Sequence, residues 1–404
     1  MTRRGRARTR RETVLVVDMG AWAAQPTARS LARAGFRVLA AGVGGRVAGR
    51  SRYFTERHVI PPALEQEAFA ERIERICARE RVDVVVPLTD EILGGLLFGP
   101  ASGGPWAVVG PTAEQFTRFC DKAVLLETAA AAGLASPAST VVTPAGVSGP
   151  LPPLPAYVKV VSGPDAGRAV PRPVRVGDAE SCEREVRRLV ERGEVVLIQE
   201  EVVGRQLRFH FVRRHGKMAH LAARTLANYP FRVGQSTVSQ FLPSPPELVE
   251  VSVALLEAGG YEGAGVIQYV ERGGVWYVHD VNLRMPSSVD ATIAAGLDMP
   301  RFAVEIALGR VPDLASARPR PLRHVQLNGE VLALRDALGG VCVGRSAARI
   351  AAGLAVAVVA PGRQLAPLDV TDPLPTLAAL TAARRGSPRQ LPSAPDPAQP
   401  AKSA

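Results

Sequence analysis

Oxygen-bearing side chains near position 280 lie at a spacing that suits a metal ion. In the segment GVIQYVERGGVWYVHDVNLR, the pair Gly273 and Gly274 marks the turn of a β-hairpin. Side chains alternate along a strand, so Asp280 and Asn282 fall on one face of the second strand. Mg²⁺ prefers hard oxygen ligands, takes one or two from protein and completes its octahedron with phosphate and water. Asp280 and Asn282 are therefore candidate ligands of Mg²⁺, although such a pair taken alone more often only ends a strand.

Gln268 and Arg284 are two further candidates for the face that carries Asp280 and Asn282. A three-residue loop places Gln268 opposite Asp280 as a further ligand, whereas a two-residue loop places them on opposite faces, and the sequence leaves this register open. Arg284 follows on the same face as Asp280. A guanidinium in that place can hold a carboxylate or a developing phosphoryl charge.

Lysine is scarce in this chain, which makes each lysine informative. Only four of the 49 basic residues are lysines, at positions 122, 159, 217 and 402, so arginine serves almost wherever an exposed positive charge suffices. Lys159 lies in the apolar run AYVKVV, where burial of an unpaired ammonium is costly unless an anion compensates it. The alternative is a lysine whose stem reaches the surface from a half-buried strand.

The loop after Lys159 favours an anion site. Its sequence is SGPDAG, in which Ser162, Gly163 and Gly167 give a small backbone that can approach phosphate oxygens, although an ordinary hairpin turn has a similar composition. Lys122 lies near the start of an alanine-rich helix, where a solvated position is its plain interpretation. Because arginine would serve equally there, the choice of lysine indicates a compact charge of the kind that binds phosphate.

The composition excludes several other classes of protein. The 404 residues are 47% hydrophobic, which suits two or three globular domains. The four cysteines lie far apart without a CxxC pair, which predicts neither a zinc knuckle nor a disulfide framework and fits a reducing cytoplasm. No apolar stretch approaches the roughly 18 residues of a membrane span, and the N-terminus lacks a secretory signal. We expect a soluble, cytoplasmic protein with no membrane partner.

The net charge of +11 is a weak sign of nucleic-acid binding. The basic residues are scattered, except for a cluster at 2–11 that is typical of a disordered tail and carries no interleaved aromatic residues. Nucleic-acid binding through this tail stays as a minor alternative, and it predicts a salt-steep affinity that is lost when residues 1–11 are deleted. The oligomeric state is open, with a homo-oligomer among the options.

Strands and helices alternate over the first quarter of the chain. Apolar runs at 13–18, 36–41 and 82–87 predict buried strands, and the stretches that lead to 33 and that span 67–79 and 90–97 predict helices. Such alternation predicts an open parallel sheet over residues 12–115. Neither a GxGxxG fingerprint nor a Walker A sequence occurs, so a dinucleotide fold or a P-loop does not explain the phosphate chemistry.

Strands dominate the middle of the chain. A helix is predicted at 116–132 and a loop around 144–155. Strands are predicted at 156–161, 195–200, 207–213, 217–223 and in the hairpin 265–282, with a helix at 246–258. Beyond 310, modest helical stretches precede a low-complexity tail after about 385. The fold class is therefore α/β followed by α+β.

The order of these features resembles the ATP-grasp superfamily, in particular ligases related to the large subunit of carbamoyl-phosphate synthase and to biotin carboxylase. The similar segments include VDVVVPLTDE, CDKAVLLETAAAAGLASPAS, AYVKVVSGPDAG, LIQEEVVG, GYEGAGVIQYV and HDVNLRMPSSVDATIAAGLDMP, in that order. The resemblance implies a Rossmann-like pre-ATP-grasp domain at 12–115 and two ATP-grasp lobes at 116–190 and 191–310. A C-terminal helical appendix at 311–385 and a disordered tail at 386–404 would follow.

The resemblance also implies how the chain holds ATP and Mg²⁺. Lys122 and Lys159 would contact the phosphates, and the loop with Ser162, Gly163 and Gly167 would close over them. The hinge between the lobes would be formed by Gln199, Glu200, Glu201 and Val202, with the Glu200 carbonyl and the Val202 amide at the adenine edge, and Gln206 would lie at the ribose. The metal ligands would be Gln268, Asp280 and Asn282. Arg284 and Arg224 would be basic residues near the reacting groups.

Three residues depart from the family pattern, and one of them, Gln268, makes the metal site less anionic. Asp280 replaces the usual glutamate, and Gln206 and Gln268 replace acids. The resemblance implies an ATP-dependent ligase that joins a small-molecule carboxylate to an amine through an acyl phosphate, with ATP and Mg²⁺. The two glutamines keep a second hypothesis open, a non-catalytic ATP-binding regulator or scaffold with the same fold. Neither substrate can be identified from the sequence.

Overall fold

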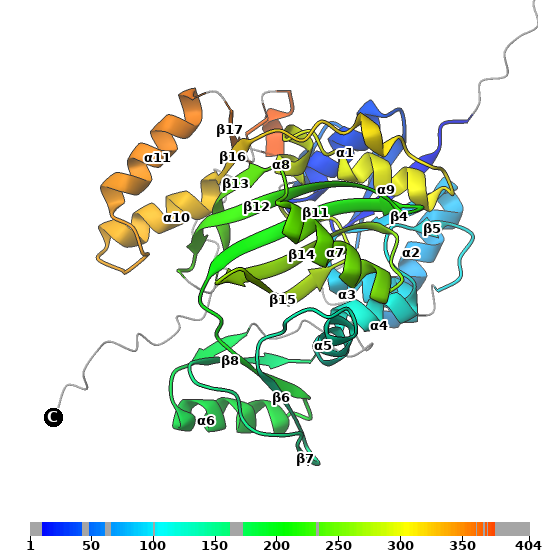
Figure 1. The fold of residues 1–404 in the computed structure, drawn as a ribbon. Helices are drawn as coiled ribbons and strands as arrows, with labels where there is room; N and C mark the ends of the chain where they lie inside the picture. Colours follow the sequence, from blue (N-terminus) through cyan, green and yellow to red (C-terminus); the bar gives the residue numbers. More distant parts are fainter. Residues whose placement is uncertain are drawn as a thin grey trace, which may run out of the picture.

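Three β-sheets organise the chain (Figure 1). The computed structural model describes residues 10–42, 48–60, 66–99, 102–161, 173–231, 234–360, 362–366, 368–369 and 371–375. No helix within these ranges is long and apolar enough to cross a membrane.

The first sheet is parallel, as the alternating sequence predicts. Its order is β3-β2-β1-β4-β5. Side chains from both faces of the central strand are buried: Val14 and Val16 in one apolar core, Leu15 and Val17 in another. The elements are β1 Thr13–Val17, α1 Ala24–Arg33, β2 Arg37–Gly42, the 3₁₀ turn Ala48–Arg50, β3 Glu56–Val59, α2 Gln66–Glu80, β4 Val84–Pro87, α3 Asp90–Phe98 and β5 Ala107–Val108.

The single helix predicted at 116–132 is wrong, because the structure has two helices there. They are α4 Ala113–Cys120 and α5 Lys122–Ala131. Asp121 separates them, and its carboxylate caps α5 by accepting from the backbone N–H groups of Ala123 and Val124. Lys122 is therefore the first residue of α5, at the helix N-terminus.

The second sheet is antiparallel and small, with the order β7-β6-β10-β8-β9. Helix α6 covers one face, where it packs on Val158, Val160 and Ile198. Alternation along β8 and β10 therefore turns Lys159 and Gln199 to the other face. The elements are β6 Ser139–Thr143, β7 Gly146–Val147, β8 Ala156–Val160, β9 Val174–Val176, α6 Ala179–Val190 and β10 Val196–Glu200.

The third sheet has seven strands in the order β15-β14-β11-β12-β13-β16-β17. One face packs against α5 and α7 through Phe209 and Phe211. The other face packs against α8, α9 and the first sheet through Val212 and Phe241. The elements are β11 Arg205–Arg214, β12 Lys217–Tyr229, β13 Gln235–Leu242, α7 Pro246–Ala258, β14 Gly263–Arg272, β15 Val275–Asn282, α8 Val289–Ala294, α9 Met299–Ala307, β16 Leu322–Gln326 and β17 Arg363–Ala366.

The region after 310 is not only helical, contrary to the prediction. Besides the 3₁₀ turn Leu314–Ser316, α10 Leu327–Leu338 and α11 Ala347–Val359, it supplies β16 and β17, which extend the third sheet beyond β13. These strands are short and mix polar with apolar residues, so their alternation is weak in the sequence. The tail predicted after about 385 lies outside the described residues.

Candidate functional site

The β14–β15 hairpin places Gln268 opposite Asp280, but by a route that the sequence did not reveal. The loop has two residues, Gly273 and Gly274, because Arg272 pairs with Val275. Such a loop alone would put Gln268 and Asp280 on opposite faces. The register shifts by one residue at His279, which has no partner on β14, and this β-bulge brings Gln268 and Asp280 together.

Hydrogen bonds join the three predicted metal ligands. Gln268 Nε2 donates to Asp280 Oδ2 over 2.6 Å, and Asn282 Nδ2 donates to the same oxygen over 2.7 Å. Among the described residues, no hydrogen bond reaches Asp280 Oδ1. The cluster thus presents one carboxylate with an unused oxygen, flanked by two amides.

Arg284 links this cluster to the first sheet. Its Nη2 donates to Asn282 Oδ1 over 3.1 Å and to Asp90 Oδ2 over 2.7 Å, and its Nε donates to the same Asp90 oxygen over 3.0 Å. Asp90 begins α3, directly after the carboxyl end of β4. Burial would lower the pKa of Arg284, but Asp90 raises it above the ordinary value. The guanidinium is therefore firmly charged and fixed in direction.

Lys159 is buried and bonded to Gln199. Its exposed fraction is 9%, so the alternative of a stem that reaches the surface is wrong. Nζ donates to Gln199 Oε1 over 2.6 Å, and Gln199 Nε2 donates to Ser139 Oγ over 3.0 Å. Burial and then the charge of Lys122 lower the pKa of Lys159 to about 8, against the opposing effect of Asp280.

The charges of the two lysines also act on the hairpin. Burial raises the pKa of Asp280, but Lys122, His279, the hydrogen bond from Asn282 and Lys159 together bring it below the ordinary value. Burial, reinforced by Lys159, lowers the pKa of His279 to about 4, so this imidazole is neutral near pH 7. Two lysines, a carboxylate and an arginine, from α5, β8, β15 and the segment after β15, thus lie close enough for their charges to act on one another, which suits a metal-bound polyphosphate.

Solved structures with the same architecture identify the fold. No family model and no curated protein matches the sequence. An L-amino acid ligase from Bacillus licheniformis is similar, with a TM-score of 0.62 at 17% identity over 78% of this chain and 80% of that chain. The ADP complex of PurK, an N5-carboxyaminoimidazole ribonucleotide synthetase, gives 0.61 at 13% identity over 81% and 85%. The chain shares the ATP-grasp fold of these two structures.

A third similar ATP-grasp structure contains a nucleotide and a metal. The biotin carboxylase domain dimer of the Hydrogenobacter thermophilus 2-oxoglutarate carboxylase, in complex with MgADP, ADP and bicarbonate, gives a TM-score of 0.59 at 17% identity. The similarity covers 77% of this chain and 73% of that one. At such identities the likeness concerns the fold, and the roles of individual residues must be argued from their own contacts.

The residues predicted as a hinge lie where the chain passes from the small ATP-grasp sheet to the large one (Figure 1). The side-chain oxygen of Gln199 accepts a hydrogen bond from Lys159 Nζ. Glu200 accepts from Arg272 over 3.1 Å, and Glu201 accepts from Arg175, so the two acidic side chains are ion-paired. Val202 follows in the connecting segment, and Gln206 is exposed at the start of β11. Their roles toward adenine and ribose stay predictions.

Two groups of predicted residues do not join the cluster. Ser162, Gly163 and Gly167 lie outside the described residues. Arg224 is exposed on β12, where it pairs with Leu207 and so points to the face of the sheet that packs on α7. Alternation puts it on the opposite face from Gln268 and Asp280. The structure therefore does not bring Arg224 to the phosphate site.

Sequence reasoning missed three residues near the cluster, namely Asp90, Arg208 and His210. Asp90 had a signal, because it follows a buried parallel strand, and ligands of such sheets lie at the carboxyl ends of strands. Arg208 and His210 gave none, because the sequence does not show which face of β11 is covered. In the structure, Arg208 lies beside Gln268 on the neighbouring strand, and His210 is fully buried with Nε2 3.1 Å from Ser288 Oγ.

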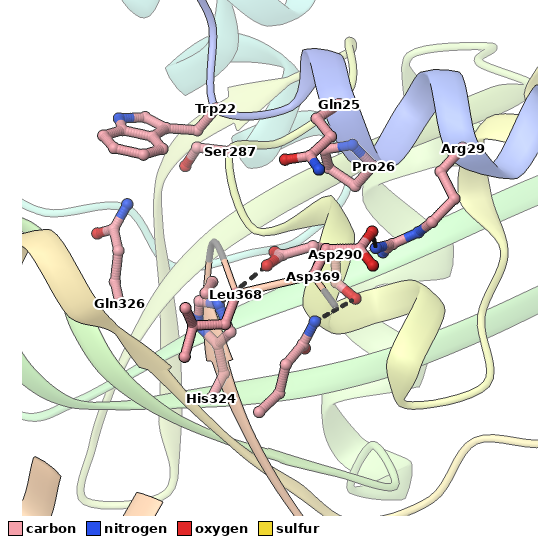
Figure 2. Close-up of a pocket in the computed structure, with 12 residues that line it drawn as sticks. Trp22, Gln25, Pro26, Arg29, Ser287, Asp290, His324, Gln326, Leu368 and Asp369 are labelled. Carbon is pink, nitrogen blue, oxygen red and sulfur yellow. Dashed lines mark hydrogen bonds and ion pairs between the residues drawn. The ribbon is translucent and has the colours of Figure 1, made fainter. Parts of the chain in front are cut away.

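A shallow hollow opens between α1 and the end of the large ATP-grasp sheet (Figure 2). Its walls include the ion pair in which Arg29 donates to Asp369, and His324 Nε2 lies 3.5 Å from Asp290 Oδ2. Figure 2 shows Trp22 and Ser287 on one side of this space and Gln326 on the other. Two of the residues that line the hollow, Ser287 and Asp290, follow Arg284 closely in the sequence.

Proposed function

We propose that this protein is an ATP-dependent ligase that joins a carboxylate to an amine through an acyl phosphate, with Mg²⁺. The observation that carries the proposal is the convergence of Lys122, Lys159, Asp280 and Arg284 on one cleft. The ATP-grasp fold and the similarity to an L-amino acid ligase support it. Phosphorylation turns a carboxylate oxygen into a good leaving group, which an amine can then displace without a nucleophilic side chain of the protein.

The lysines have the environment that phosphate binding needs. Lys159 is buried with an amide oxygen as its hydrogen-bond acceptor, and Lys122 begins α5, where the helix dipole also favours anions. The two positive charges disfavour each other, which is part of the reason for the lowered pKa of Lys159. A polyphosphate between them would relieve that repulsion.

The cluster of Asp280, Gln268 and Asn282 fits a hard cation. Asp280 Oδ1 is not used by hydrogen bonds among the described residues, and both amides carry oxygens of the type that Mg²⁺ prefers. Gln268 turns its NH₂ group to Asp280, so its amide must rotate before its oxygen can serve as a ligand. When bound there, Mg²⁺ would neutralise charge on the phosphates.

Arg284 is suited to hold the reacting carboxylate. Asp90 fixes its guanidinium from the first sheet and Asn282 fixes it from the hairpin. Its Nη1 also donates to the Met285 carbonyl over 3.4 Å, so one N–H on Nη1 has no acceptor among the described residues and is available to a substrate carboxylate. Arg284 would thus orient the substrate oxygen toward the phosphate that the two lysines hold.

A non-catalytic ATP-binding regulator is the second candidate function. The observation in its favour is that the metal cluster holds one carboxylate, with Gln268 donating to it instead of adding a second negative charge. Loss of a charged ligand weakens metal binding, since even the loss of a residue that only orients a ligand commonly costs 10- to 100-fold in metal affinity.

Release of ADP distinguishes the two functions. The full chain would be incubated with ATP, Mg²⁺ and a panel of carboxylates and amines, next to Lys159→Ala as the inactive control. ADP release that needs both a carboxylate and an amine, and that Lys159→Ala lacks, is the result expected of a ligase. ATP binding without ADP release over the whole panel, in the wild type and in Gln268→Glu, would refute the ligase and favour the regulator.

A further inference from the structure

Arg208 is a partly buried arginine on the third sheet. It lies in the middle of β11, with Gln268 on one neighbouring strand and Ala223 on the other. Its Nη2 donates to the hydroxyl of Ser239, and its Nε is buried without a hydrogen-bond partner. Burial lowers the pKa of the guanidinium to about 10, which still leaves it charged near pH 7. Among the described residues, no carboxylate pairs with it.

This guanidinium lies between the metal cluster and the hollow. Asp280, Gln268 and Arg208 are direct neighbours across β15, β14 and β11, so the backbones of Asp280 and Arg208 are roughly 10 Å apart, two strand spacings. On its other side, Ser239 pairs with His324, which lines the hollow (Figure 2). A molecule that reaches from Asp280 into the hollow would therefore pass Arg208.

A purely structural role does not account for Arg208. Removal of a guanidinium from water is costly, and proteins recover that cost by pairing the charge with an acid. The same cleft shows this solution at Arg284, which has Asp90. A hydrogen bond to a neutral serine hydroxyl offsets little of the cost of removing a guanidinium from water. The Ser239 hydroxyl also forms a hydrogen bond of 2.8 Å with the Ser236 hydroxyl. An unpaired charge beside a reactive site is more useful as the receptor for an anion.

We propose that Arg208 binds a carboxylate of the substrate other than the one that is activated. Arg284 would hold the reacting carboxylate near Asp280, and Arg208 would hold a second acidic group of the same molecule or the free carboxylate of an amino acid that supplies the amine. The ligase would thus act on dicarboxylic acids or on α-amino acids. This inference rests on the proposed function for its setting, but it makes a claim about binding that can be tested without turnover.

Matched pairs of small molecules test the claim. Binding of glutarate against butyrate, and of L-alanine against L-alaninamide, would be measured by calorimetry with the full chain saturated with Mg²⁺ and a non-hydrolysable ATP analogue. The proteins compared are the wild type, Arg208→Met, Arg208→Lys and the control Arg213→Met. Arg213 lies on the same strand but on the other face, where Glu257 pairs with it over 3.0 Å.

The wild type should bind the more acidic member of at least one pair about tenfold more tightly or better, as a charged hydrogen bond implies. Arg208→Met should lose this preference, Arg208→Lys should keep part of it, and Arg213→Met should keep all of it. A preference within the glutarate pair assigns Arg208 to the carboxylate donor, and one within the alanine pair assigns it to the amine. Because a partly buried charge without an acidic partner among the described residues is removed, the ligand-free Arg208→Met protein should melt at the same temperature as the wild type or higher.

The inference would be overturned if Arg208→Met kept the preference, or if the wild type showed no preference or no binding. It would also be overturned if Arg208→Met lost only affinity for the ATP analogue, because that result would assign Arg208 to the phosphates. A lower melting temperature with an unchanged preference would show a structural role and overturn it as well. The proposed ligase function fails separately. If the preference depends on Arg208 but no pair supports ADP release, the anion site stands and the ligase does not.

Discussion

The two sides of the cleft treat positive charge differently. On the hairpin side, Asp90 neutralises Arg284 and outweighs the effect of burial on its pKa. On the other side, Lys159 rests on the amide of Gln199 and Arg208 on the hydroxyl of Ser239, and burial lowers their pKa values to about 8 and about 10. A charge that an acid neutralises is held in a direction, whereas a charge without an acidic hydrogen-bond partner among the described residues is suited to receive an anion.

Removal of Lys159 should have the largest effect on ligand binding. Lys159→Ala takes away a buried cation that would contact phosphate, so the affinity for Mg-ATP should fall by about 100-fold or more, which is ~3 kcal/mol for a charged hydrogen bond in a buried site. Calorimetric titration measures this change, with Lys217→Ala, an exposed lysine on β12, as the control. If Lys159→Ala bound Mg-ATP as tightly as the wild type, Lys159 would not contact the phosphates, and the proposed difference between the two sides would be refuted.

Removal of the neutralising partner should destabilise the hairpin side. Asp90→Asn leaves the Arg284 guanidinium without its carboxylate, at a cost of about 1–3 kcal/mol because the pair is partly exposed. Urea unfolding measures the loss, and the double variant Asp90→Asn/Arg284→Met should recover part of it. Equal stability of Asp90→Asn and the wild type would mean that the two sides of the cleft do not differ in charge compensation.

The pH dependence of ATP binding should follow Lys159. Since its pKa in the free protein is lowered to about 8, the affinity for ATP should fall by up to about tenfold per pH unit above pH 8, and binding there should take up a proton. The ligand-free protein should become more stable as pH rises from about 8 toward 10.5, because the folded state releases this proton before the unfolded state does. Calorimetry in buffers of different ionisation enthalpy counts the proton, and Lys159→Arg should abolish its uptake.

A second carboxylate in the metal cluster should have the smallest effect. Gln268→Glu adds a charged oxygen beside Asp280 and should raise the affinity of the ATP-loaded protein for Mg²⁺ by several-fold to about tenfold. The same change at Gln240, which points to the other face of the sheet opposite Arg224, should leave that affinity unchanged. A metal titration that gives equal affinities for the wild type and Gln268→Glu would place the metal away from Gln268.

The sequence predicted the residues of the cleft better than the contacts between them. Asp280 and Asn282 share a face because of simple alternation, and the rarity of lysine drew attention to Lys122 and Lys159. The bulge at His279 was not predictable, because a one-residue slip leaves no mark on the composition of a strand. Nor was the bond between Arg284 and Asp90, which joins residues 194 positions apart.

Whether a basic side chain has an acidic partner was the property of the site that the sequence predicted least well. Whether an arginine is compensated depends on which strands become neighbours, and Arg208 gains Gln268 and Ser239 only when β11, β13 and β14 assemble. Helix α5 shows the same limit at a smaller scale, because one aspartate, Asp121, divides what reads in the sequence as a single helix. Local chemistry therefore identified the candidates, and long-range pairing decided their roles.

A crystal structure of the full chain with Mg²⁺ and a non-hydrolysable ATP analogue tests the central claim most directly. The account predicts phosphate oxygens within hydrogen-bond distance of the Nζ atoms of both Lys122 and Lys159, and a metal ion bound to Asp280 and Asn282. It also predicts that Lys159 exchanges Gln199 for phosphate as its principal partner. A nucleotide bound elsewhere, or a metal ion that does not touch Asp280, would contradict it.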